Sequence, residues 1–421
     1  MRQVMDSLVA LKASDFRLLA GASLVSGASR ALIPIAFAVE TVRVEPQGWG
    51  MASVLSALWA GRFFGLLVYK RLGYRFQAFA IMIGAALVMC LAQAGLFAWI
   101  SLSANSIMAM SVSAFVYGVA AAFYFPSMFV AIPMVTTQST RTQANSVLSM
   151  IGDVYAIIGP LLGVSLVLVF GFNLVLVFDA VTLLMAATLI GVLYTRHGVQ
   201  GAQATQQPAK GGGQTALEAT DTLPTWAYLG FLSWFFCAVA IGLAGAAGPT
   251  MIMAYHSATA WAQVATAMAA GSLVGSAASL MGLARRVPWP LLHGFCGAGL
   301  AVQLFVVSTP VTVWLVCLAG SVGAASASAS GIRWDTLGLS GFTGMRLHGF
   351  ASLDQFAQTA GIPAGILLFG ISGAMDMRGP AIVGAGALAL VFVIPVLVGF
   401  VRENGLREPA GAPPLTPEPQ T

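Results

Sequence analysis

The sequence predicts an all-α membrane protein with twelve transmembrane helices in two pseudo-symmetric six-helix bundles. Three observations predict this fold class. First, 58% of the 421 residues are hydrophobic and only 8% are charged, whereas a soluble domain carries about 25% charged residues. Second, twelve apolar stretches are long enough to cross a bilayer, which takes about 20 residues. Third, one polar segment divides these stretches into six and six.

The twelve predicted spans follow one another along most of the chain. A segment at 196–225, rich in Gly, Gln, Ala and Thr, interrupts them and is predicted to be a flexible cytoplasmic linker. The predicted domains are therefore an N-terminal bundle over 1–195, this linker, a C-terminal bundle over 226–402 and a disordered tail over 403–421. The spans are expected at 17–41, 48–69, 76–100, 106–135, 143–170, 173–195, 226–253, 260–283, 288–308, 310–332, 348–372 and 379–401.

The basic residues predict the orientation, because cytoplasmic loops carry an excess of Lys and Arg. If both termini are cytoplasmic, 15 of the 19 Lys and Arg lie on the cytoplasmic side. Only Arg43 and Arg378 lie on the opposite side, while Arg30 and Arg62 fall inside spans. The net charge of +5 is then explained by topology, which argues against a nucleic-acid partner. We expect a multi-pass protein of a bacterial inner (cytoplasmic) membrane.

The two halves carry signs of an internal duplication. A shift of 202 residues places GPLLG at Gly159–Gly163 on GIPAG at Gly361–Gly365. The same shift places Asp153 on Gln355, which follows Asp354. Basic turns also follow both the second and the eighth span. Together these matches predict two parallel six-helix repeats.

Several stretches, in their order and spacing, resemble the major facilitator superfamily, and within it the exporters of siderophores and macrolides. The resemblance implies the twelve-helix fold and an antiporter that couples efflux to protons, with siderophore export or antibiotic resistance as the role. The stretches are SDFRLLAGASLVSG at 14–27, FPSMFVAIPMV, QANSVLSMIGD and IIGPLLG in spans four and five, FDAVTLL at 178–184, IRWDTLGL at 332–339 and MRLHGFASLDQ at 345–355.

The chain departs from the family pattern at two places. The family loop after span two reads Gly-x-x-x-Asp-Arg-x-Gly-Arg-Arg, but here Gly65 to Arg75 reads GLLVYKRLGYR. Tyr69 or Lys70 stands where the acid is expected, so the usual charge lock between cytoplasmic helix ends is in question. Relatives also often carry Gly-Asp in span one, where this chain has Gly27-Ala28 followed by Arg30.

Arg30 is the residue that most strongly indicates a functional site, because it is a charged residue near the middle of a predicted span. A charge near the middle of a span costs about 2.5–3.5 kcal/mol on insertion scales, so its side chain is expected to face a cavity. Ser26 and other small or polar residues share its helical face. Arg30 either binds an anionic group of the substrate through its planar fork, or forms a structural pair with Asp153.

Asp153 is the predicted proton-coupling residue. A substrate that competes for Arg30 would change the proton affinity of Asp153. The alternative is a permanent salt bridge or a hydrogen bond to the backbone. Further along the same span, Gly159, Pro160 and Gly163 are predicted to bend span five, because Pro160 removes a backbone hydrogen bond, and so to let the bundles rock.

The remaining candidates are assigned to the gate or to the substrate. Arg62 is interpreted as a snorkelling or gate-locking charge, Asp179 as structural, and Asp354 with Arg346 as a cytoplasmic gate. Glu40 is expected to be solvated. The predicted substrate contacts, for which packing is the alternative in the aromatic cases, are Arg30, Ser26, Tyr117, Tyr124, Trp234 and Gln358.

The sequence therefore predicts a proton-coupled exporter of a small organic molecule, anionic and siderophore- or antibiotic-like. One alternative is a multidrug exporter of lipophilic cations, and another is a non-transporting receptor or assembly factor on the same fold. No motif indicates an enzyme, and no enzyme activity is predicted. Transport driven by ATP is not expected, since the GGG at 211–213 lacks the Gly-Lys-Ser/Thr of a phosphate-binding loop. No cofactor or metal is expected. The expected partners are the substrate, protons and lipid, and the chain is expected to be a monomer.

Overall fold

The computed structural model describes residues 13–44, 49–103, 106–204, 223–256, 258–374 and 378–391. Twelve long α-helices and two short 3₁₀ turns fill these ranges, which confirms the predicted all-α, twelve-helix fold. The helices are α2 (Ser14–Val44), α3 (Trp49–Leu72), α4 (Ala78–Leu102), α5 (Ile107–Val135), α6 (Arg141–Phe170), α7 (Phe172–Ala204), α8 (Thr225–Tyr255), α9 (Ala258–Leu280), α10 (Trp289–Val307), α11 (Val313–Gly341), α12 (Gly344–Ala374) and α13 (Arg378–Val391); the turns are η2 (Gly73–Arg75) and η3 (Leu283–Arg286).

Two helices run well past their predicted ends. Helix α11 continues to Gly341, although the apolar pattern ends at residue 332. Arg333 and Asp335 end that pattern, yet both lie inside the helix, and Arg333 is buried rather than in a loop. Helix α7 continues to Ala204, into the predicted linker, whose residues 205–222 lie outside the described part of the chain. Residues 392–401 of the twelfth predicted span also lie outside it.

Seven of the described helices are long and apolar enough to cross a membrane by a strict measure of length and hydropathy, namely α2, α4, α5, α7, α8, α10 and α11. Helices α3, α6 and α12 contribute residues to the central cavity described below.

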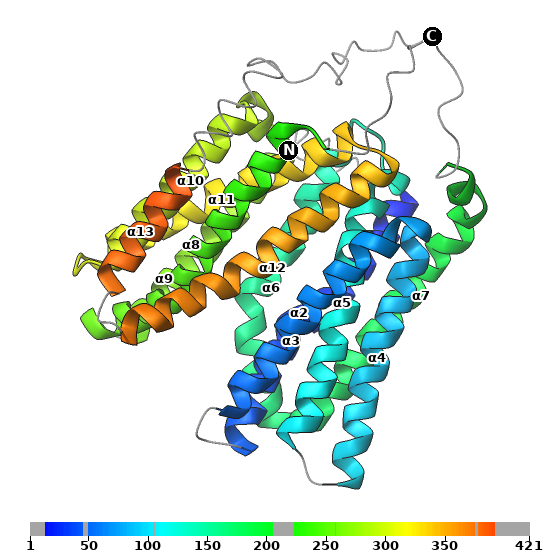
Figure 1. Ribbon diagram of the computed structural model, residues 1–421, viewed down its shortest axis with the longest axis horizontal. Coiled ribbons are helices and arrows are strands. Elements are labelled where there is room, and N and C mark those ends of the chain that lie inside the picture. The colour runs from blue at the N-terminus through cyan, green and yellow to red at the C-terminus, as the bar shows by residue number, and fades with distance from the viewer. Residues whose placement is uncertain are drawn as a thin grey trace.

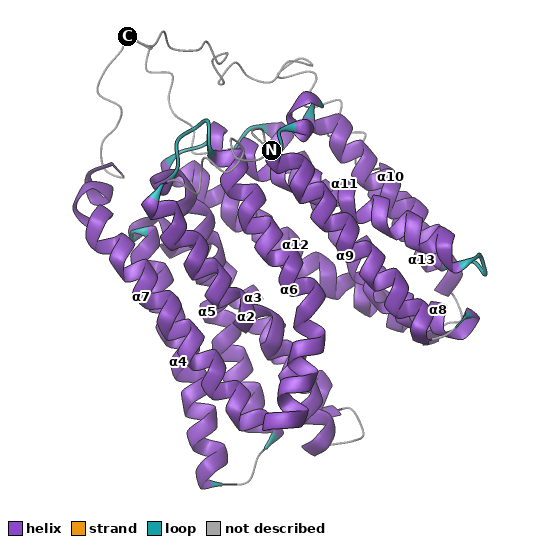
Figure 2. Cartoon of the chain, turned by 180° about the vertical axis from the view of Figure 1, so that it is seen from behind, coloured by secondary structure: helices purple, strands orange, loops and turns teal. Residues whose placement is uncertain are grey.

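The helices form two groups, α2–α7 and α8–α13, within which most helix contacts are made. Figure 1 shows that the groups approach each other at the end where α2 begins and α3 ends, and diverge at the opposite end. The reverse view in Figure 2 shows the same arrangement. Contacts between the groups involve mainly α3 and α5 with α12, and α6 with α9 and α11. The predicted domain boundaries at 195 and 226 stay predictions.

Glycines allow the closest helix pairs to form. A Cβ atom at Gly61 of α3 or Gly118 of α5 would collide with backbone carbonyl oxygens of the facing helix. In the second group, Gly271 and Gly275 of α9 lie in the same way against the backbone of α11. Small residues let helices approach closely in lipid, where dispersion contacts replace the hydrophobic effect as the force between helices.

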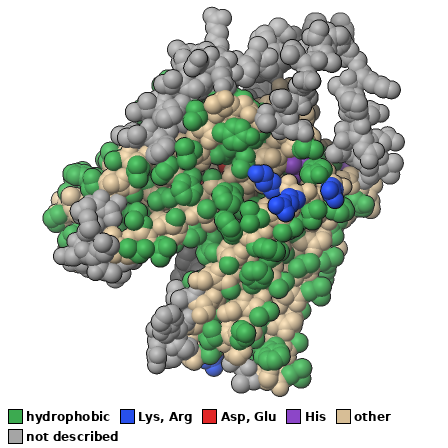
Figure 3. All heavy atoms as spheres, viewed as in Figure 1, with side chains coloured by type: hydrophobic (Ala, Val, Ile, Leu, Met, Phe, Trp, Pro, Cys, Tyr) green, Lys and Arg blue, Asp and Glu red, His purple; other side chains and the backbone are tan. Residues whose placement is uncertain are grey.

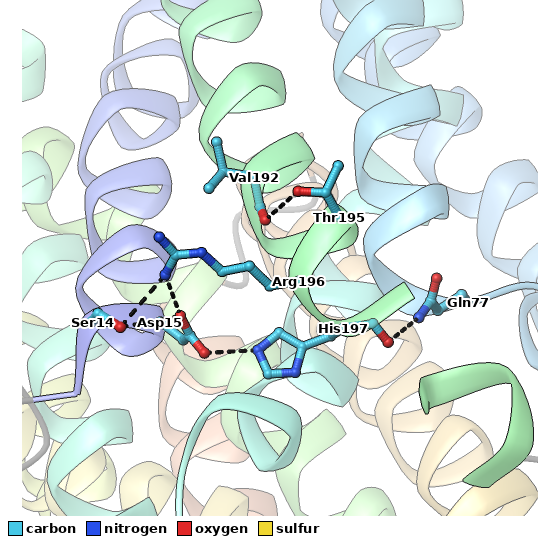
Figure 4. Close-up of polar contacts among 7 residues, drawn as sticks. All are labelled: Ser14, Asp15, Gln77, Val192, Thr195, Arg196 and His197. Carbon is cyan, nitrogen blue, oxygen red and sulfur yellow. Dashed lines mark hydrogen bonds and ion pairs between the residues drawn. The ribbon is translucent and has the colours of Figure 1, made fainter. Parts of the chain in front are cut away.

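A polar cluster ties the start of α2 to the end of α7 (Figure 4). The Arg196 guanidinium lies 2.7 Å from one carboxylate oxygen of Asp15, and His197 Nε2 lies 2.8 Å from the other. Gln77, just before α4, donates a hydrogen bond to the His197 carbonyl oxygen. Arg196 is half exposed, so its ion pair contributes about 1 kcal/mol or less. The cluster joins α2, α7 and the segment before α4 at the end of the first helix group where α2 begins.

Candidate functional site

A cavity of 480 Å³ lies between the two helix groups. Its walls come from α2, α3, α5 and α6 on one side and from α11 and α12 on the other. Polar and apolar side chains contribute to it, as suits an amphipathic small molecule. The lining residues are Ser23, Trp59, Arg62, Phe125, Met128, Phe129, Ile132, Asn145, Leu148, Ser149, Gly152, Asp153, Asp335, Asp354, Gln355, Gln358, Thr359 and Ile362.

Arg62 brings a positive charge to this cavity. Its guanidinium carbon lies 4.9 Å from the centre of the Trp59 ring, which is within cation–π range. Both side chains line the cavity and are half-buried. The interpretation of Arg62 as a snorkelling or gate-locking charge stays a prediction. The side chain faces the space between the bundles, because the Trp59 ring one turn away holds it there.

Asp153 of α6 is bound by the opposite helix group. Ser272 Oγ donates to one carboxylate oxygen at 2.7 Å, and Ser276 Oγ donates to the other at 2.6 Å. Ser276 also lies 2.7 Å from Ser328 Oγ and 3.1 Å from Ser149 Oγ. Hydrogen bonds to a charged acceptor are short and strong. Asp153 thus joins the two groups through hydroxyls of α9.

Arg30 belongs to α2, but its side chain lies outside the described part of the structure. The predicted pair of Arg30 with Asp153, and the predicted grip of Arg30 on an anionic substrate, therefore stay predictions. Ser23, which shares a helical face with Ser26, lines the cavity two turns before Arg30. Helix α2 therefore contributes to the cavity wall through the helical face on which the sequence pattern places Ser23, Ser26 and Arg30.

Asp354 of α12 is bound within its own helix group. Trp334 Nε1 donates to one carboxylate oxygen at 2.9 Å, and Gln358 Nε2 donates to the other at 3.1 Å. Asp335 of α11 lines the same cavity and interacts electrostatically with Asp354. Two neighbouring carboxylates repel each other when both are charged. A proton or a cation bound beside them would relieve that repulsion.

Contacts between the groups close the cavity toward the end where α2 begins and α3 ends. Tyr69 Oη lies 3.1 Å from His348 Nδ1, and Arg141 donates to the Leu339 carbonyl oxygen at 2.6 Å. The rings of Phe129 and Phe350 stack with centroids 5.9 Å apart. Together these contacts connect α3, α5 and α6 with α11 and α12. We call them the terminal gate.

Most of the predicted substrate contacts lie away from this cavity. Tyr124 donates a hydrogen bond to Ser26 at 3.2 Å, and both side chains are buried in the first helix group. Tyr117 is also buried there, while Trp234 packs on His293 in the second group. These four residues do not line the 480 Å³ cavity, and their placement favours the packing alternative. Gln358 does line it.

The predicted gate and structural residues are placed as follows. Asp354 lines the cavity, Arg346 is half-buried near the start of α12, and Asp179 is buried in α7. Gly159 is buried in α6, which stays helical to Phe170; the side-chain surroundings of Pro160 and Gly163 lie outside the described structure, and the bend stays a prediction.

One expectation about the outer end of α2 is wrong. The sequence predicts a solvated Glu40, but this residue is only 6% exposed. Arg43, one turn further on, is exposed and lies 3.7 Å from its carboxylate, so the acid is buried in the helix group beside a cation at its edge.

Sequence reasoning missed Asp335, Ser272, Ser276 and His348. Ser272 and Ser276 are four residues apart, a spacing that puts both hydroxyls on one helical face, but serine is common in close helix packing as well. Asp335 follows the predicted end of a span at residue 332, so the apolar pattern places it outside the membrane. His348 has no neighbour in sequence that points to its partner Tyr69.

Residues 19–340 match the sequence profile of the Major Facilitator Superfamily. The chain belongs to this superfamily. No curated protein matches the sequence. Among solved structures, a bacterial homologue of the iron transporter ferroportin in an outward-facing state is similar with a TM-score of 0.70 and 14% identity, over 92% of this chain and 98% of that one. A variant of the E. coli fucose:proton symporter FucP is similar with a TM-score of 0.65 and 13% identity, over 91% and 98%. These similarities show the fold.

The terminal gate of this major facilitator transporter differs from the family pattern. Tyr69 occupies one of the two positions that can replace the missing loop acid, and it reaches across to His348. Ser127 donates a further hydrogen bond to the Tyr69 hydroxyl at 3.4 Å. A bond between a phenol and an imidazole therefore joins the helix ends here. The resemblance to siderophore and macrolide exporters stays a prediction.

Proposed function

We propose that this transporter exports a small organic molecule from the cytoplasm in exchange for protons, with the central cavity as its binding site and Asp153 as the proton carrier. The observation that supports the proposal is the position of Asp153. It lies in the cavity wall, and its two hydrogen-bond donors, Ser272 and Ser276, belong to the opposite helix group. Movement of one group against the other must therefore change the surroundings of this carboxylate.

The geometry links that movement to the proton. In the present arrangement two hydroxyls satisfy the charged form of Asp153. If α9 moves away from α6, both donors are lost, and an ionised carboxylate without partners is costly in an apolar medium. A proton bound by Asp153 removes that cost. Binding of a proton therefore favours one arrangement of the helix groups over the other, which is the requirement for coupling.

The charge of the cargo has two candidates. Arg62 in the cavity, and Arg30 as predicted from the sequence, favour an anionic group on a small amphipathic molecule. The second candidate is a lipophilic cation. It is favoured by a specific observation, since three carboxylates, those of Asp153, Asp335 and Asp354, line the same cavity.

Transport into everted vesicles with an imposed proton gradient tests the coupling. Asp153→Asn is expected to abolish gradient-driven accumulation, because the amide cannot carry the proton. Asp15→Asn is the matched control, since it makes the same chemical change at a partly exposed acid far from the cavity. Gradient-driven accumulation that persists in Asp153→Asn would contradict the proposal.

The same vesicles distinguish the two cargo classes. A fluorescein-type anionic dye and ethidium, a lipophilic cation, are offered to the wild type and to Arg30→Ala. For an anionic cargo we expect transport of the anion only, and its loss in Arg30→Ala at unchanged expression. Ethidium transport as fast as that of the anion would support the cation instead.

A further inference from the structure

A second hollow lies on the outer side of the first helix group, away from the central cavity. This groove has a volume of 590 Å³ and is lined by apolar residues of three helices and the turn η2. Its residues fall within Phe64–Leu72 of α3, Ala80–Val88 of α4 and Phe115–Phe123 of α5. Phe64 and Phe76, on its rim, are 53% and 61% exposed. The groove is therefore open toward the surroundings of the helix group.

The groove has the length of an acyl chain segment in one leaflet. Each of the three helical stretches covers eight residue steps, which is about 12 Å of helix. Half of the hydrocarbon core of a bilayer is about 15 Å thick. One end of the groove is at Leu72 and Gly73, where α3 ends, on the same side of the molecule as the terminal gate. The groove thus runs from a membrane interface toward the bilayer midplane.

Basic residues surround that end of the groove. Lys70, Arg71 and Arg75 are exposed, and they flank the groove residues Leu72 and Gly73 in the chain. No acidic residue occurs between positions 46 and 152, and none of the three cations forms an ion pair with a described residue. Figure 3 shows basic side chains gathered near this end of the first helix group, with hydrophobic side chains covering the surface beyond them.

We propose that the groove and these three cations form a binding site for one anionic diacyl phospholipid, independent of the transported cargo. An acyl chain fills the apolar groove, and the headgroup phosphate lies against Lys70, Arg71 and Arg75. A zwitterionic lipid would bring its own cation to the same cluster, so the excess of positive charge selects an anionic headgroup. Arg side chains bind phosphate oxygens through paired N–H donors.

The wall of the groove also touches the terminal gate. Phe123 lines the groove and packs edge-on against Tyr69, with ring centroids 5.6 Å apart. Gly73 lies so close to the Tyr69 ring that a Cβ atom there would be 2.7 Å from it. Tyr69 in turn reaches His348 of the other helix group. A lipid in the groove therefore supports the side of the gate that faces the membrane.

Native mass spectrometry of the purified full chain tests the site. The protein is titrated in detergent with phosphatidylglycerol or with phosphatidylcholine of the same acyl chains. We expect the wild type to retain phosphatidylglycerol preferentially. A basic residue near an anionic lipid changes affinity about five-fold, so replacing Lys70, Arg71 and Arg75 by Gln is expected to weaken phosphatidylglycerol binding about a hundred-fold. Arg285→Gln with Arg286→Gln, at the matching turn of the second half, is the control and is expected to retain binding.

A second pair of variants tests the groove itself. A side chain at Gly84 of α4 would enter open space, and Gly84 lines the groove. Gly84→Leu is therefore expected to fill the groove without a clash and to reduce phosphatidylglycerol binding. Gly95→Leu adds the same side chain on the same helix, also in open space but outside the groove, and is expected to leave binding unchanged. Equal retention of both lipids by the wild type, or unchanged phosphatidylglycerol binding in Gly84→Leu and in the triple variant, would overturn the proposal.

Discussion

Two acids of the central cavity, Asp153 of α6 and Asp354 of α12, are held in different ways. The donors to Asp153 are Ser272 and Ser276, which belong to the opposite helix group. The donors to Asp354 are Trp334 and Gln358, which belong to its own group. The sequence repeat places the two acids at nearly matching positions, one residue out of register. Their partners break that symmetry.

The difference has a mechanical consequence. When the helix groups move against each other, the hydrogen bonds of Asp153 must break, whereas those of Asp354 can move with their group. Only Asp153 therefore experiences the conformational change as a change in its hydrogen bonding. We expect Asp153 to couple the proton to the movement, and Asp354 to keep its hydrogen bonds to Trp334 and Gln358 throughout, at the wall of the site beside Asp335.

The largest expected effect separates the two acids directly. Asp153→Asn is expected to reduce gradient-driven accumulation to the level of passive equilibration. Asp354→Asn keeps an acceptor for Trp334, and its new NH2 group can donate to Gln358 once the Gln358 amide turns its oxygen toward it, so both partners stay within the group. Transport is therefore expected to slow but to remain dependent on the gradient. Initial rates in vesicles with and without a proton gradient check both. If Asp354→Asn lost the gradient dependence and Asp153→Asn kept it, Asp354 would be the proton carrier instead of Asp153.

A smaller effect is expected from the donors. Ser272→Ala with Ser276→Ala removes two hydrogen bonds to a charged group, each worth about 1.5–3 kcal/mol. The present arrangement of the groups is then expected to lose population by about a hundredfold or more. Gln358→Ala, which removes a donor within one group, is the control. Pulsed electron spin resonance between labels at exposed Leu168 of α6 and Val274 of α9 measures the distance distribution. Identical distributions in both variants would show that the serines do not hold the groups together.

The smallest effect concerns the terminal gate. Tyr69→Phe removes the bond to His348, and a neutral hydrogen bond contributes about 0.5–1.5 kcal/mol. The closed form of the gate is expected to lose population about fivefold. Tyr74→Phe changes the same chemical group five residues away and serves as the control. The measurement is the rate at which a small thiol reagent reaches a cysteine placed at Asn145, which lines the cavity. An unchanged rate in Tyr69→Phe would show that the bond between Tyr69 and His348 does not hold the gate closed.

The sequence predicts the helices better than the site. The first eleven spans agree with the described helices within a few residues except where a helix continues past polar residues, as at Arg333 and Asp335 of α11, while the end of the twelfth span lies outside the described residues. Asp153, Arg62, Asp354 and Gln358 are candidates from the sequence, and all four line the cavity. Ser26, Tyr117, Tyr124 and Trp234 are candidates as well, but they lie in the interiors of their own groups. An aromatic residue has the same hydropathy on either face of a helix. Composition could therefore not distinguish an aromatic residue that lines the cavity from one that packs inside a helix group.

The sequence by itself determined the number of helices, the family and the presence of charges inside the membrane. These follow from local properties, since about 20 consecutive apolar residues suffice for a span and a charge among them is costly wherever the helix stands. Only the tertiary structure decided that Asp153 meets Ser272 and Ser276, and that Tyr69 meets His348. Those contacts depend on how each helix is rotated about its axis. That rotation is set by close packing at residues such as Gly61 and Gly118, between helices far apart in the chain.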